Sequence, residues 1–512
     1  MGALASCLMI QGTASGVGKS VLTAGLCRLL ARAGYRVAPF KSQNMALNAA
    51  VTPDGREIGR AQAVQAEAAG LEPSVDMNPI LLKPEGENRS QVVVAGVPRA
   101  VVDFTAYGRL RAELFPVVQA SLDRLRRDHE IVVIEGAGSP AEINLADGEI
   151  VNMRIARLAE APVVLVGDID RGGVFAAFVG TLALLEPQDR ERIAAFIINK
   201  FRGDRSLLTS GLEMLTRRTD RPMLGVVPWL EDIALAAEDS LDLDGRVPRA
   251  DADVDIAVVR PPMIANFDDF EPLADEPRVA VRFVRRPEDL ARADLVILPG
   301  SKSTIADLAW LRRTGLADAI VARAEDGGPV LGICGGYQML GRAVRDPLGV
   351  ESSAGEAAGL SLLDTVTAFT ADKTTVRVRA RIEGATELFA AACGAEISAY
   401  EIHMGTTETR EPRRPFTVVA RGGATVEEAD GATNGRGNVV GTYMHGLFAN
   451  DILRRAVLGH LAGRKGLEPD ARWGRPRGVD RYDRLADVVG GAIDLGLLAR
   501  LLRIDPRRLS SS

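Results

Sequence analysis

Short runs rich in valine and isoleucine recur along this chain, and a longer amphipathic segment follows each of them. In the first half, the runs are CLMIQG (7–12), RVAPFKS (36–42), IVVIEGAG (131–138), VVLVGDID (163–170), AAFIINK (194–200) and MLGVVPW (223–229). Buried parallel strands read as continuous apolar runs, and parallel strands need helical crossovers between them. The alternation therefore predicts an α/β fold built on a doubly wound parallel sheet.

The alternation stops once and then starts again, which divides the chain. Residues 236–255, AAEDSLDLDGRVPRADADVD, are acidic and contain proline and glycine, a composition unsuited to a core. A second α/β series follows, with apolar runs at 255–262, 294–304, 329–336 and 438–448. We therefore expect a first domain over 1–237, a linker over 238–253, a second α/β domain over 254–455 and a helical C-terminal extension over 456–512.

A glycine-rich stretch, QGTASGVGKS (11–20), lies between the first apolar run and a segment of helical periodicity. Backbone N–H groups at a helix N-terminus bind phosphate, a lysine adds positive charge, and a serine hydroxyl can ligate Mg²⁺. The stretch predicts an ATP-binding phosphate loop made by Gly12, Thr13, Gly16, Gly18, Lys19 and Ser20. Its spacing is one residue longer than the usual pattern. Ala14 stands where partition ATPases carry a lysine, which argues against that class.

Two further strand ends point to the same nucleotide site. Glu135 ends the run IVVIE, where its carboxylate can reach Mg²⁺ together with Ser20. Asn199 and Lys200 begin a sequence similar to a guanine-reading motif, but Arg202 occupies the position of its aspartate. We therefore expect adenine as the base and Asn199 as its reader.

Cys334 lies in VLGICGGYQML, between an apolar run and the start of a helical segment. Flanking glycines permit the strained turn of a strand–nucleophile–helix elbow, and a helix N-terminus favours the thiolate. We predict that Cys334 attacks a carbonyl carbon. The Gly335 N–H would be one oxyanion donor, and Gly300 or Ser301 of PGSKST the other. Gln338 is expected in the same substrate-binding pocket.

The base beside this thiol should be a histidine, and the chain has four: His129, His403, His445 and His460. His445 follows a strand of the second domain, which places it where an imidazole could reach Cys334. His403 is the alternative base. The other two histidines are expected at the surface.

Charge and cysteine content narrow the class of partner. The formal charge of −6 provides no basic field for nucleic acid. The four cysteines have no metal-binding spacing and suit a reducing cytoplasm. No stretch approaches about 18 uninterrupted apolar residues, the length of a membrane span. We expect a cytoplasmic enzyme with neither nucleic acid nor membrane as a partner, and we leave open whether it forms a homo-oligomer.

The motifs GICGGYQMLG and YMHGLF resemble the class I glutamine amidotransferases of the cobyrinic and cobyric acid type, and the phosphate loop resembles that of dethiobiotin synthetase-like ligases. The likeness runs through most of residues 8–450 and includes PFKSQNMALNA, MNPILLKP, VIEGAGSPAEINL, DIDRGGVFA, INKFRGD and EIHMGTT. It implies an ATP- and Mg²⁺-dependent, amide-forming synthetase domain followed by a glutaminase domain. The matching segments also imply substrate contacts by Lys41, Asn44, Lys83, Asp170 and Arg171.

At one position the chain departs from the wider amidotransferase pattern. Many members of the class carry a glutamate two residues after the histidine, and here that position is Leu447. We therefore expect a Cys334–His445 dyad, with Glu401 as a candidate for orienting the histidine.

By resemblance, the acceptor is a corrinoid, adenosyl-cobyrinic acid a,c-diamide. Its b, d, e and g carboxylates would receive nitrogen from L-glutamine to give adenosyl-cobyric acid. ATP would activate each carboxylate as an acyl phosphate, and ammonia made at Cys334 would pass between the domains. Three alternatives remain: an amidotransferase for the a and c carboxylates of cobyrinic acid, one for a lipid-linked cell-wall acceptor and, in a different class, a partition or scaffold ATPase.

Overall fold

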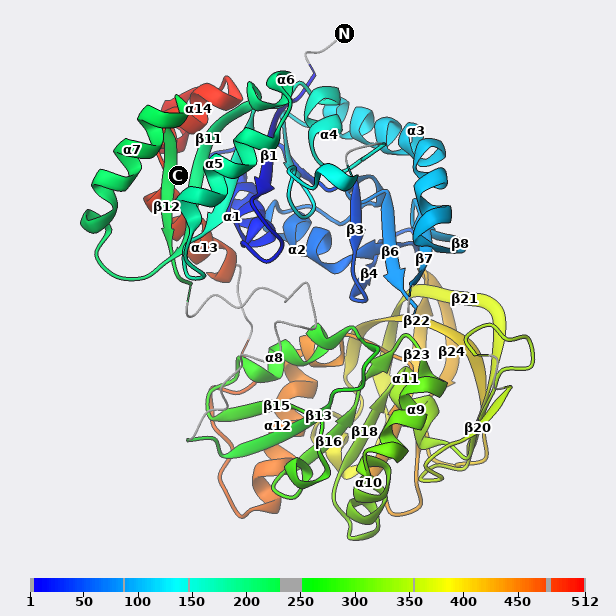
Figure 1. Cartoon of the computed structure of the whole chain (residues 1–512). Helices are drawn as coiled ribbons and strands as arrows, with labels where there is room; N and C mark the ends of the chain where they lie inside the picture. Colours follow the sequence, from blue (N-terminus) through cyan, green and yellow to red (C-terminus); the bar gives the residue numbers. More distant parts are fainter. Residues whose placement is uncertain are drawn as a thin grey trace.

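The computed structural model describes residues 4–85, 88–145, 148–230, 251–352, 355–475 and 480–510. Figure 1 shows two units, one above the other, with the N-terminal half of the chain in the upper unit. Most of the linker expected over 238–253 lies outside the described residues. In the part of the chain that is described, no helix is both long and apolar enough to cross a membrane.

A six-stranded parallel sheet forms the centre of the first unit, in the order β12-β11-β10-β1-β9-β2. Its strands are β1 (Ser6–Gly12), β2 (Val37–Phe40), β9 (Ile131–Glu135), β10 (Val163–Asp168), β11 (Ile193–Phe201) and β12 (Met223–Pro228). Along β1, Leu8 and Ile10 enter one apolar core, whereas Cys7 and Met9 enter the core on the opposite face. Both faces of the sheet are therefore buried, and the predicted doubly wound fold is confirmed.

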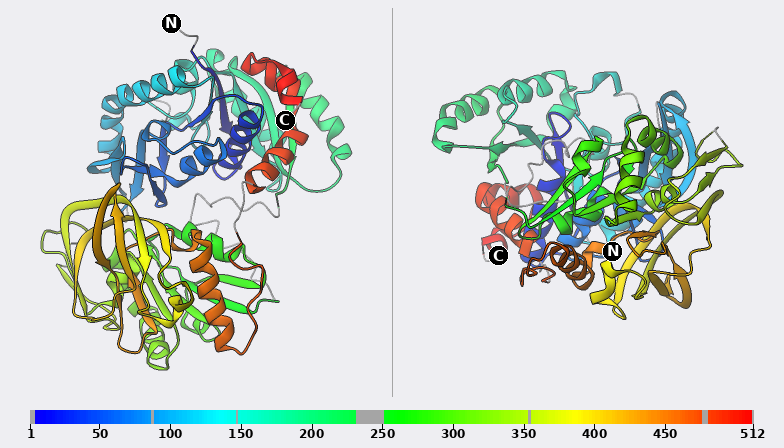
Figure 2. Two further views of the ribbon diagram at one scale, coloured as in Figure 1. Left: turned by 180° about the vertical axis from the view of Figure 1, so that it is seen from behind. Right: turned by 90° about the horizontal axis from the view of Figure 1, so that it is seen from below.

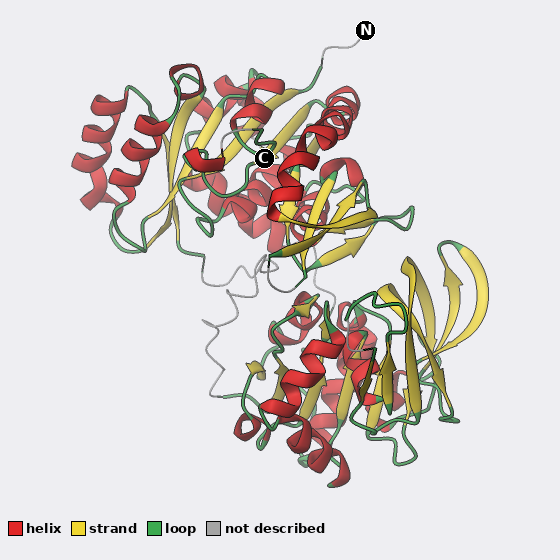
Figure 3. Ribbon diagram, turned by 45° about the vertical axis from the view of Figure 1, so that its right-hand side comes forward, coloured by secondary structure: helices red, strands yellow, loops and turns green. Residues whose placement is uncertain are grey.

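Helices cover the two faces of this sheet (Figure 3). Leu22 and Leu26 of α1 pack on one side, and Leu114 and Val118 of α3 pack on the other. The helices that the N-terminal half of the chain contributes to this unit are α1 (Lys19–Arg32), α2 (Arg60–Ala68), α3 (Phe104–Asp128), α4 (Met153–Leu158), α5 (Val174–Leu184), α6 (Pro187–Arg190) and α7 (Thr209–Thr219). This is the helix–sheet–helix layering that alternating strands and helices favour.

Two small β elements extend from the first unit toward the second (Figure 1). One is a four-stranded sheet in the order β3-β6-β7-β8, and the other is the hairpin β4-β5. Their strands are β3 (Gln43–Met45), β4 (Ala49–Val51), β5 (Glu57–Gly59), β6 (Ile80–Pro84), β7 (Arg89–Val94) and β8 (Val97–Asp103). They place the segment after β2 at the boundary between the units.

The second unit is also built on a six-stranded sheet, in the order β15-β13-β16-β18-β26-β25. Only β25 runs antiparallel. The strands are β13 (Val254–Val259), β15 (Val279–Val284), β16 (Leu295–Leu298), β18 (Val330–Ile333), β25 (Ala432–Thr433) and β26 (Val439–Thr442). Its helices are α8 (Glu271–Ala274), α9 (Thr304–Arg313), α10 (Leu316–Glu325), α11 (Gly335–Leu340) and α12 (Asp451–Arg464).

A second sheet of this unit flanks the first and is dominated by two long antiparallel strands, β21 (Thr365–Ile382) and β22 (Glu396–Thr409). It is completed by β19 (Ala343–Arg345), β20 (Glu356–Ala358), β23 (Phe416–Arg421) and β24 (Ala424–Asp430). A two-residue pairing of β14 (Ile264–Ala265) with β17 (Gly300–Ser301) lies apart from both sheets. Strand β22 also contacts β4 of the first unit.

An apolar cluster joins the two units. It contains Ala49, Val51 and Leu81 from the first unit, with Ile402 of β22 and the partly buried Tyr400 from the second. Because buried apolar area stabilises association, this cluster helps to hold the units in one arrangement.

The helices near the C-terminus belong to both units. Leu453, Val457 and Leu461 of α12 enter the core of the second unit, so the boundary expected at residue 455 falls inside this helix. In contrast, Leu485 and Val489 belong to the core around α1. These two residues lie on α13 (Asp480–Ala492), which is followed by α14 (Leu495–Leu502) and α15 (Pro506–Ser510). Figures 1 and 2 show α13 and α14 in the first unit. The segment 456–512 is therefore not a single extension, because its helices pack on different domains.

Candidate active site

The phosphate loop connects the end of β1 to the start of α1. Gly16 and Gly18 have φ angles of 70° and 93°, in the left-handed region that favours glycine. A Cβ at Gly12 would lie 2.6 Å from Val17 and 3.0 Å from Nζ of Lys19, so the glycine permits a close approach. Nζ of Lys19 donates to the carbonyl oxygens of Ala14 and Gly138, each at 3.1 Å. The lysine therefore lies over the loop, where a phosphate would replace carbonyl oxygens as its partner.

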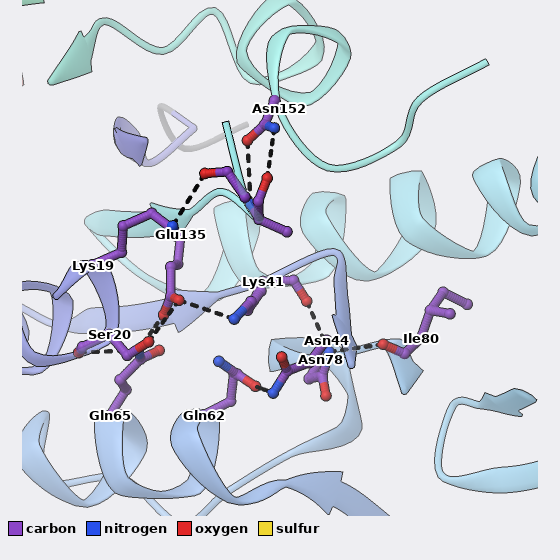
Figure 4. Close-up of polar contacts among 12 residues, drawn as sticks. Lys19, Ser20, Lys41, Asn44, Gln62, Gln65, Asn78, Ile80, Glu135 and Asn152 are labelled. Atoms are coloured by element: carbon purple, nitrogen blue, oxygen red, sulfur yellow. Dashed lines mark hydrogen bonds and ion pairs between the residues drawn. The ribbon is translucent and has the colours of Figure 1, made fainter. Parts of the chain in front are cut away.

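Glu135, at the end of β9, collects three donors beside the loop (Figure 4). Its Oε1 accepts a hydrogen bond of 2.8 Å from the Ser20 hydroxyl and lies 2.9 Å from Nζ of Lys41. Its Oε2 accepts a bond of 2.6 Å from Nε2 of Gln65. The carboxylate is only 1% exposed, and the buried Lys41 neutralises it.

The donor set at this position fits a magnesium ion. Mg²⁺ prefers oxygen ligands and uses one or two protein groups together with phosphates and water. The Ser20 hydroxyl and the Glu135 carboxylate supply such oxygens next to the phosphate loop. Oε1 of Gln65, which is buried, has no hydrogen-bond partner among the described residues. The site therefore has a buried oxygen acceptor that no protein donor satisfies.

Asn199 and Lys200, at the end of β11, support the loop from the side. Nδ2 of Asn199 donates to the Val17 carbonyl at 2.8 Å, and Nζ of Lys200 donates to the Gly16 carbonyl at 2.7 Å. Nζ of Lys200 also lies 2.8 Å from Oδ2 of Asp168. Asn199 is thus at the nucleotide site, where its role in reading adenine remains a prediction.

The five residues expected to contact substrate fall into three places. Lys41 is paired with Glu135, and Asn44 donates to Oε1 of Gln62 at 3.1 Å on the same side of the loop. Asp170 and Arg171 follow β10 and flank the loop near Gly16, with the Arg171 side chain 77% exposed.

Lys83 does not lie with the other four. Its Nζ is 2.5 Å from Oε1 of Glu57, whose Oε2 lies 2.5 Å from Nζ of Lys373 in the second unit. Both lysines line a cavity shared with Cys334. Lys83 is thus placed at the boundary between the units, in the wall of the cavity that contains Cys334.

Cys334 occupies a strained turn between β18 and α11. Its φ of 53° and ψ of −109° are unusual for a residue with a side chain, and they give the strand–nucleophile–helix geometry expected from the motif. A Cβ at Gly335 would lie 2.9 Å from the Ser301 backbone nitrogen, so these two backbone segments are in close contact. Gly335 and Ser301 therefore lie next to each other, and their role as oxyanion donors stays a prediction.

His445 lines the same cavity as Cys334 and contacts a carboxylate. Its Nδ1 lies 2.6 Å from Oδ2 of Asp269, and the Tyr400 ring stacks on the imidazole at 5.3 Å. Burial by itself would lower the pKa of His445, but Asp269 and Cys334 outweigh burial and raise the pKa to about 10. The imidazolium form is therefore favoured at neutral pH, beside the sulfur.

Asp269 is the residue that the sequence analysis missed. Leu447 is fully buried in the apolar core, and Glu401 pairs with Arg421 at 2.5 Å instead of orienting His445. His403 stacks on Tyr443 at 3.8 Å and faces Glu401. One signal could have identified Asp269: it lies in the segment after β13, and loops after parallel strands meet at one edge of a sheet.

A cavity of about 790 Å³ contains the thiol and is lined by both units. Cys334, His445 and Gln338 line it from the second unit, and Lys83 and Gln91 line it from the first. Oε1 of Gln338 accepts a bond of 3.0 Å from Thr304, which holds the side chain in the cavity wall. A small amide substrate can therefore reach the thiol in a space that the first unit helps to enclose.

Together, the fold and the two sites define a class I amidotransferase joined to a phosphate-loop nucleotide-binding domain. Family profiles agree: a CobQ/CobB/MinD/ParA nucleotide-binding domain matches residues 8–243, and a CobB/CobQ-like glutamine amidotransferase domain matches residues 255–452.

Curated relatives extend the match over almost the entire chain. The cobyric acid synthase of Sorangium cellulosum is 56% identical over 98% of this chain and 99% of its own. The cobyric acid synthase of Moorella thermoacetica is 50% identical over 98% of this chain and 98% of its own. That of Dehalococcoides mccartyi (strain ATCC BAA-2266) is 49% identical over 98% of this chain and 99% of its own. The chain belongs to the cobyric acid synthase family, which confirms the family expected from its motifs.

Proposed function

We propose that the protein uses ATP and L-glutamine to amidate the b, d, e and g carboxylates of adenosyl-cobyrinic acid a,c-diamide, giving adenosyl-cobyric acid in cobalamin biosynthesis. Kinship with cobyric acid synthases over 98% of the chain supports this acceptor. One structural observation carries the chemistry: a cavity around a cysteine–histidine–aspartate site is closed by the domain that holds the phosphate loop. We also propose a cytoplasmic location, because the reaction needs ATP and a reduced Cys334 thiol.

The first half-reaction would release ammonia from glutamine. The Cys334 sulfur attacks the side-chain amide carbon, and the Gly335 and Ser301 N–H groups stabilise the resulting oxyanion. His445 gives its proton to the departing nitrogen, so ammonia leaves and a thioester remains. Water then attacks the thioester, releasing glutamate and restoring the thiol. Throughout, Asp269 keeps the imidazole oriented toward the sulfur.

The second half-reaction would activate the acceptor. A carboxylate does not react usefully with ammonia, because oxide is a very poor leaving group. The acceptor carboxylate therefore attacks the γ-phosphate of ATP, and ADP leaves with the bridging oxygen to give an acyl phosphate. Ammonia then attacks the acyl carbon, and phosphate leaves as the amide forms. Lys19 would hold the phosphates, while Ser20 and Glu135 would hold Mg²⁺. When bound, that ion would neutralise the developing phosphate charge.

Ammonia has to move from one half-reaction to the other as the free base. In bulk water at neutral pH it is protonated and is not a nucleophile. The cavity around Cys334 is lined in part by Lys83 and Gln91 of the first unit, so ammonia would be released beside the domain boundary. We propose that ammonia crosses this boundary toward Lys41 and Glu135.

Replacement of Cys334 by alanine tests the division of labour. The variant should lose glutamine-dependent amidation by about a thousandfold or more, because no other group can form the thioester. It should retain ATP-dependent amidation when free ammonia is supplied at high concentration. Amides added to the corrinoid are counted by mass spectrometry. Cys393→Ala, which changes an exposed cysteine, is the matched control and should behave as wild type.

Two outcomes would contradict the proposal. If wild-type protein added amides to cobyrinic acid at the a and c positions instead, the acceptor would be wrong. If Cys334→Ala lost ammonia-dependent activity as well, the thiol would not be a dedicated glutaminase nucleophile.

A further inference from the structure

The carboxylate that orients His445 lies on a short turn at the boundary between the units. This turn is the 3₁₀ segment η5 (Phe267–Phe270), which contains the adjacent acids Asp268 and Asp269. Oδ1 of Asp269 accepts a 2.8 Å bond from the Gly446 N–H, and Oδ2 faces the imidazole at 2.6 Å. The position of η5 therefore sets the position of the catalytic histidine.

Residues of the first unit hold η5 in place. Oδ2 of Asp268 lies 2.8 Å from Nε of Arg60, the first residue of α2. The Phe267 N–H donates to Oδ1 of Asn48, and the Ala49 N–H donates to Oδ1 of Asn266, both at 3.3 Å. Asp268 is 7% exposed, so its charge depends on Arg60 for compensation. The catalytic triad is therefore anchored from outside its own domain.

The same helix contacts the phosphate site. Gln65, five residues after Arg60, donates from Nε2 to Oε2 of Glu135 at 2.6 Å and to the Ser20 carbonyl at 3.3 Å. Five residues of α-helix span about 7.5 Å. Because most of α2 is buried, a displacement at Gln65 moves Arg60 with it.

The contact between Arg60 and Asp268 can rearrange. Nε of Arg60 lies 2.8 Å from Oδ2 of Asp268, yet it has no partner at hydrogen-bond geometry among the residues described. The other carboxylate oxygen, Oδ1 of Asp268, has no such partner there either. A small shift of α2 could therefore align or misalign the pair. A contact that a small shift makes or breaks is the kind of element through which two sites can be coupled.

We propose that α2 couples the phosphate site to the glutaminase, with Arg60 as a positioning residue that acts on His445 through η5 and Asp269. Nucleotide and acceptor bound at the loop change the contacts of Glu135 and Ser20, and Gln65 transmits the change along α2. Glutamine is then hydrolysed fastest when the acyl phosphate can form. This inference rests on the proposed function, because it assumes that nucleotide binds at the loop.

The test is to compare glutaminase activity with and without ATP and corrinoid in wild type, Arg60→Gln and Arg60→Lys. Wild type should show stimulation by ATP and acceptor. Arg60→Gln should lower the basal kcat for glutamine about tenfold or more, leave KM within about twofold and reduce the stimulation ratio to about one. Arg60→Lys keeps the charge and should partly restore both.

Two further variants separate coupling from general damage. Asp268→Asn breaks the same ion pair without changing the shape of the side chain. Its basal kcat and stimulation ratio should match those of Arg60→Gln, and the double variant should fall no lower than either single variant. Arg377→Gln is the matched control. Arg377 also crosses the boundary, where it donates to the Val51 carbonyl and pairs with Glu72, and both of these partners lie outside α2 and η5. It should retain the stimulation ratio.

The coupling proposal is overturned if Arg60→Gln and Asp268→Asn keep the full stimulation ratio, or if Arg377→Gln loses it equally. Failure of the proposed function gives a different result, because wild type would then add no amides with ATP and free ammonia. With Arg60→Gln, ammonia-dependent amidation should stay within about twofold of wild type, which also shows that the variant is folded.

Discussion

At the scale of single residues, the glutaminase depends on how His445 is charged. The imidazole is buried between the Asp269 carboxylate, the Cys334 sulfur and the Tyr400 ring, with Asp268 and Arg60 beyond Asp269. A pKa of about 10 means that the imidazolium form persists at neutral pH and is lost only as the pH rises through that value. The proton that the leaving ammonia needs is therefore already in place.

Asp269→Asn removes this support without changing the shape of the side chain. We expect kcat for glutamine hydrolysis to fall by about 10²- to 10⁴-fold, the usual contribution of a positioned acid–base group. Because the carboxylate raises the pKa of His445, its loss lowers that pKa, and the alkaline limb of the pH–rate profile should move to lower pH. Asp372→Asn, at an exposed position of β21, should change neither quantity. An unchanged profile in Asp269→Asn would mean that the aspartate does not act on the histidine.

The residues that could be predicted from the sequence are those whose role is indicated by the residues next to them in the chain. Lys19 and Ser20 follow a glycine-rich turn, and Cys334 is flanked by a strand and a glycine pair, so local pattern alone identifies them. Asp269 and Arg60 act through contacts with residues 176 and 208 positions away. Nothing in FDDF or GRAQ shows which partner the fold will supply. Such pairings exist only in the tertiary structure.

At the scale of elements, the packing of α13 on α1 supports the helix that begins at the phosphate loop. A Cβ at Gly25 would lie 2.8 Å from Val489 and 3.2 Å from Leu485, so the glycine permits the two helices to approach closely. Arg28 and Arg32 of α1 pair with Asp483 and Asp487 at 2.8 and 2.6 Å along the rim. The sequence predicted a helical C-terminal extension over 456–512, but it could not show which unit its helices would pack on.

Gly25→Val should destabilise the first unit. Overpacking of a filled helix contact costs about 1–3 kcal/mol, and for a unit of this size each kcal/mol lowers Tm by about 2–4 °C. Scanning calorimetry should show the shift. Gly463→Ala in α12 is the control, because a Cβ there meets nothing within 4 Å and the helix gains about 0.5–1 kcal/mol. A wild-type Tm in Gly25→Val would indicate that α13 is not packed on α1.

At the scale of the whole molecule, the two units share a buried ion cluster. Glu57 of the first unit lies 2.5 Å from both Lys83 and Lys373, the latter from the second unit. Burial by itself would raise the pKa of Glu57, but the two ammonium groups outweigh it and hold the pKa well below its usual range. Burial lowers the pKa of Lys373 to about 8, so this lysine depends on Glu57 for its charge.

Glu57→Gln should therefore weaken the joined structure. Removing one partner of a buried ion cluster costs about 3–5 kcal/mol, whereas Glu72→Gln, at an exposed pair with Arg377, should cost less than about 1 kcal/mol. Because the folded pKa of Glu57 is depressed, its contribution is fully present above about pH 4.3 and is lost as the pH falls further. Urea unfolding at a series of pH values measures the difference from wild type. A difference that grew on acidification would contradict this assignment.

The placement of α13 and α14 also has a consequence for how the protein is made. Their apolar faces cover α1, but the ribosome reaches them only after it has synthesised every strand of the glutaminase. The ATP half therefore cannot finish folding while its partner half is still incomplete. A gene split between residues 230 and 251 would leave α1 uncovered in the N-terminal product. The C-terminal product would carry α13 and α14 without the surface on which they pack. Because the ATP-binding unit needs helices that are encoded after the glutaminase unit, each complete carboxylate-activating unit is made together with one nitrogen-releasing unit.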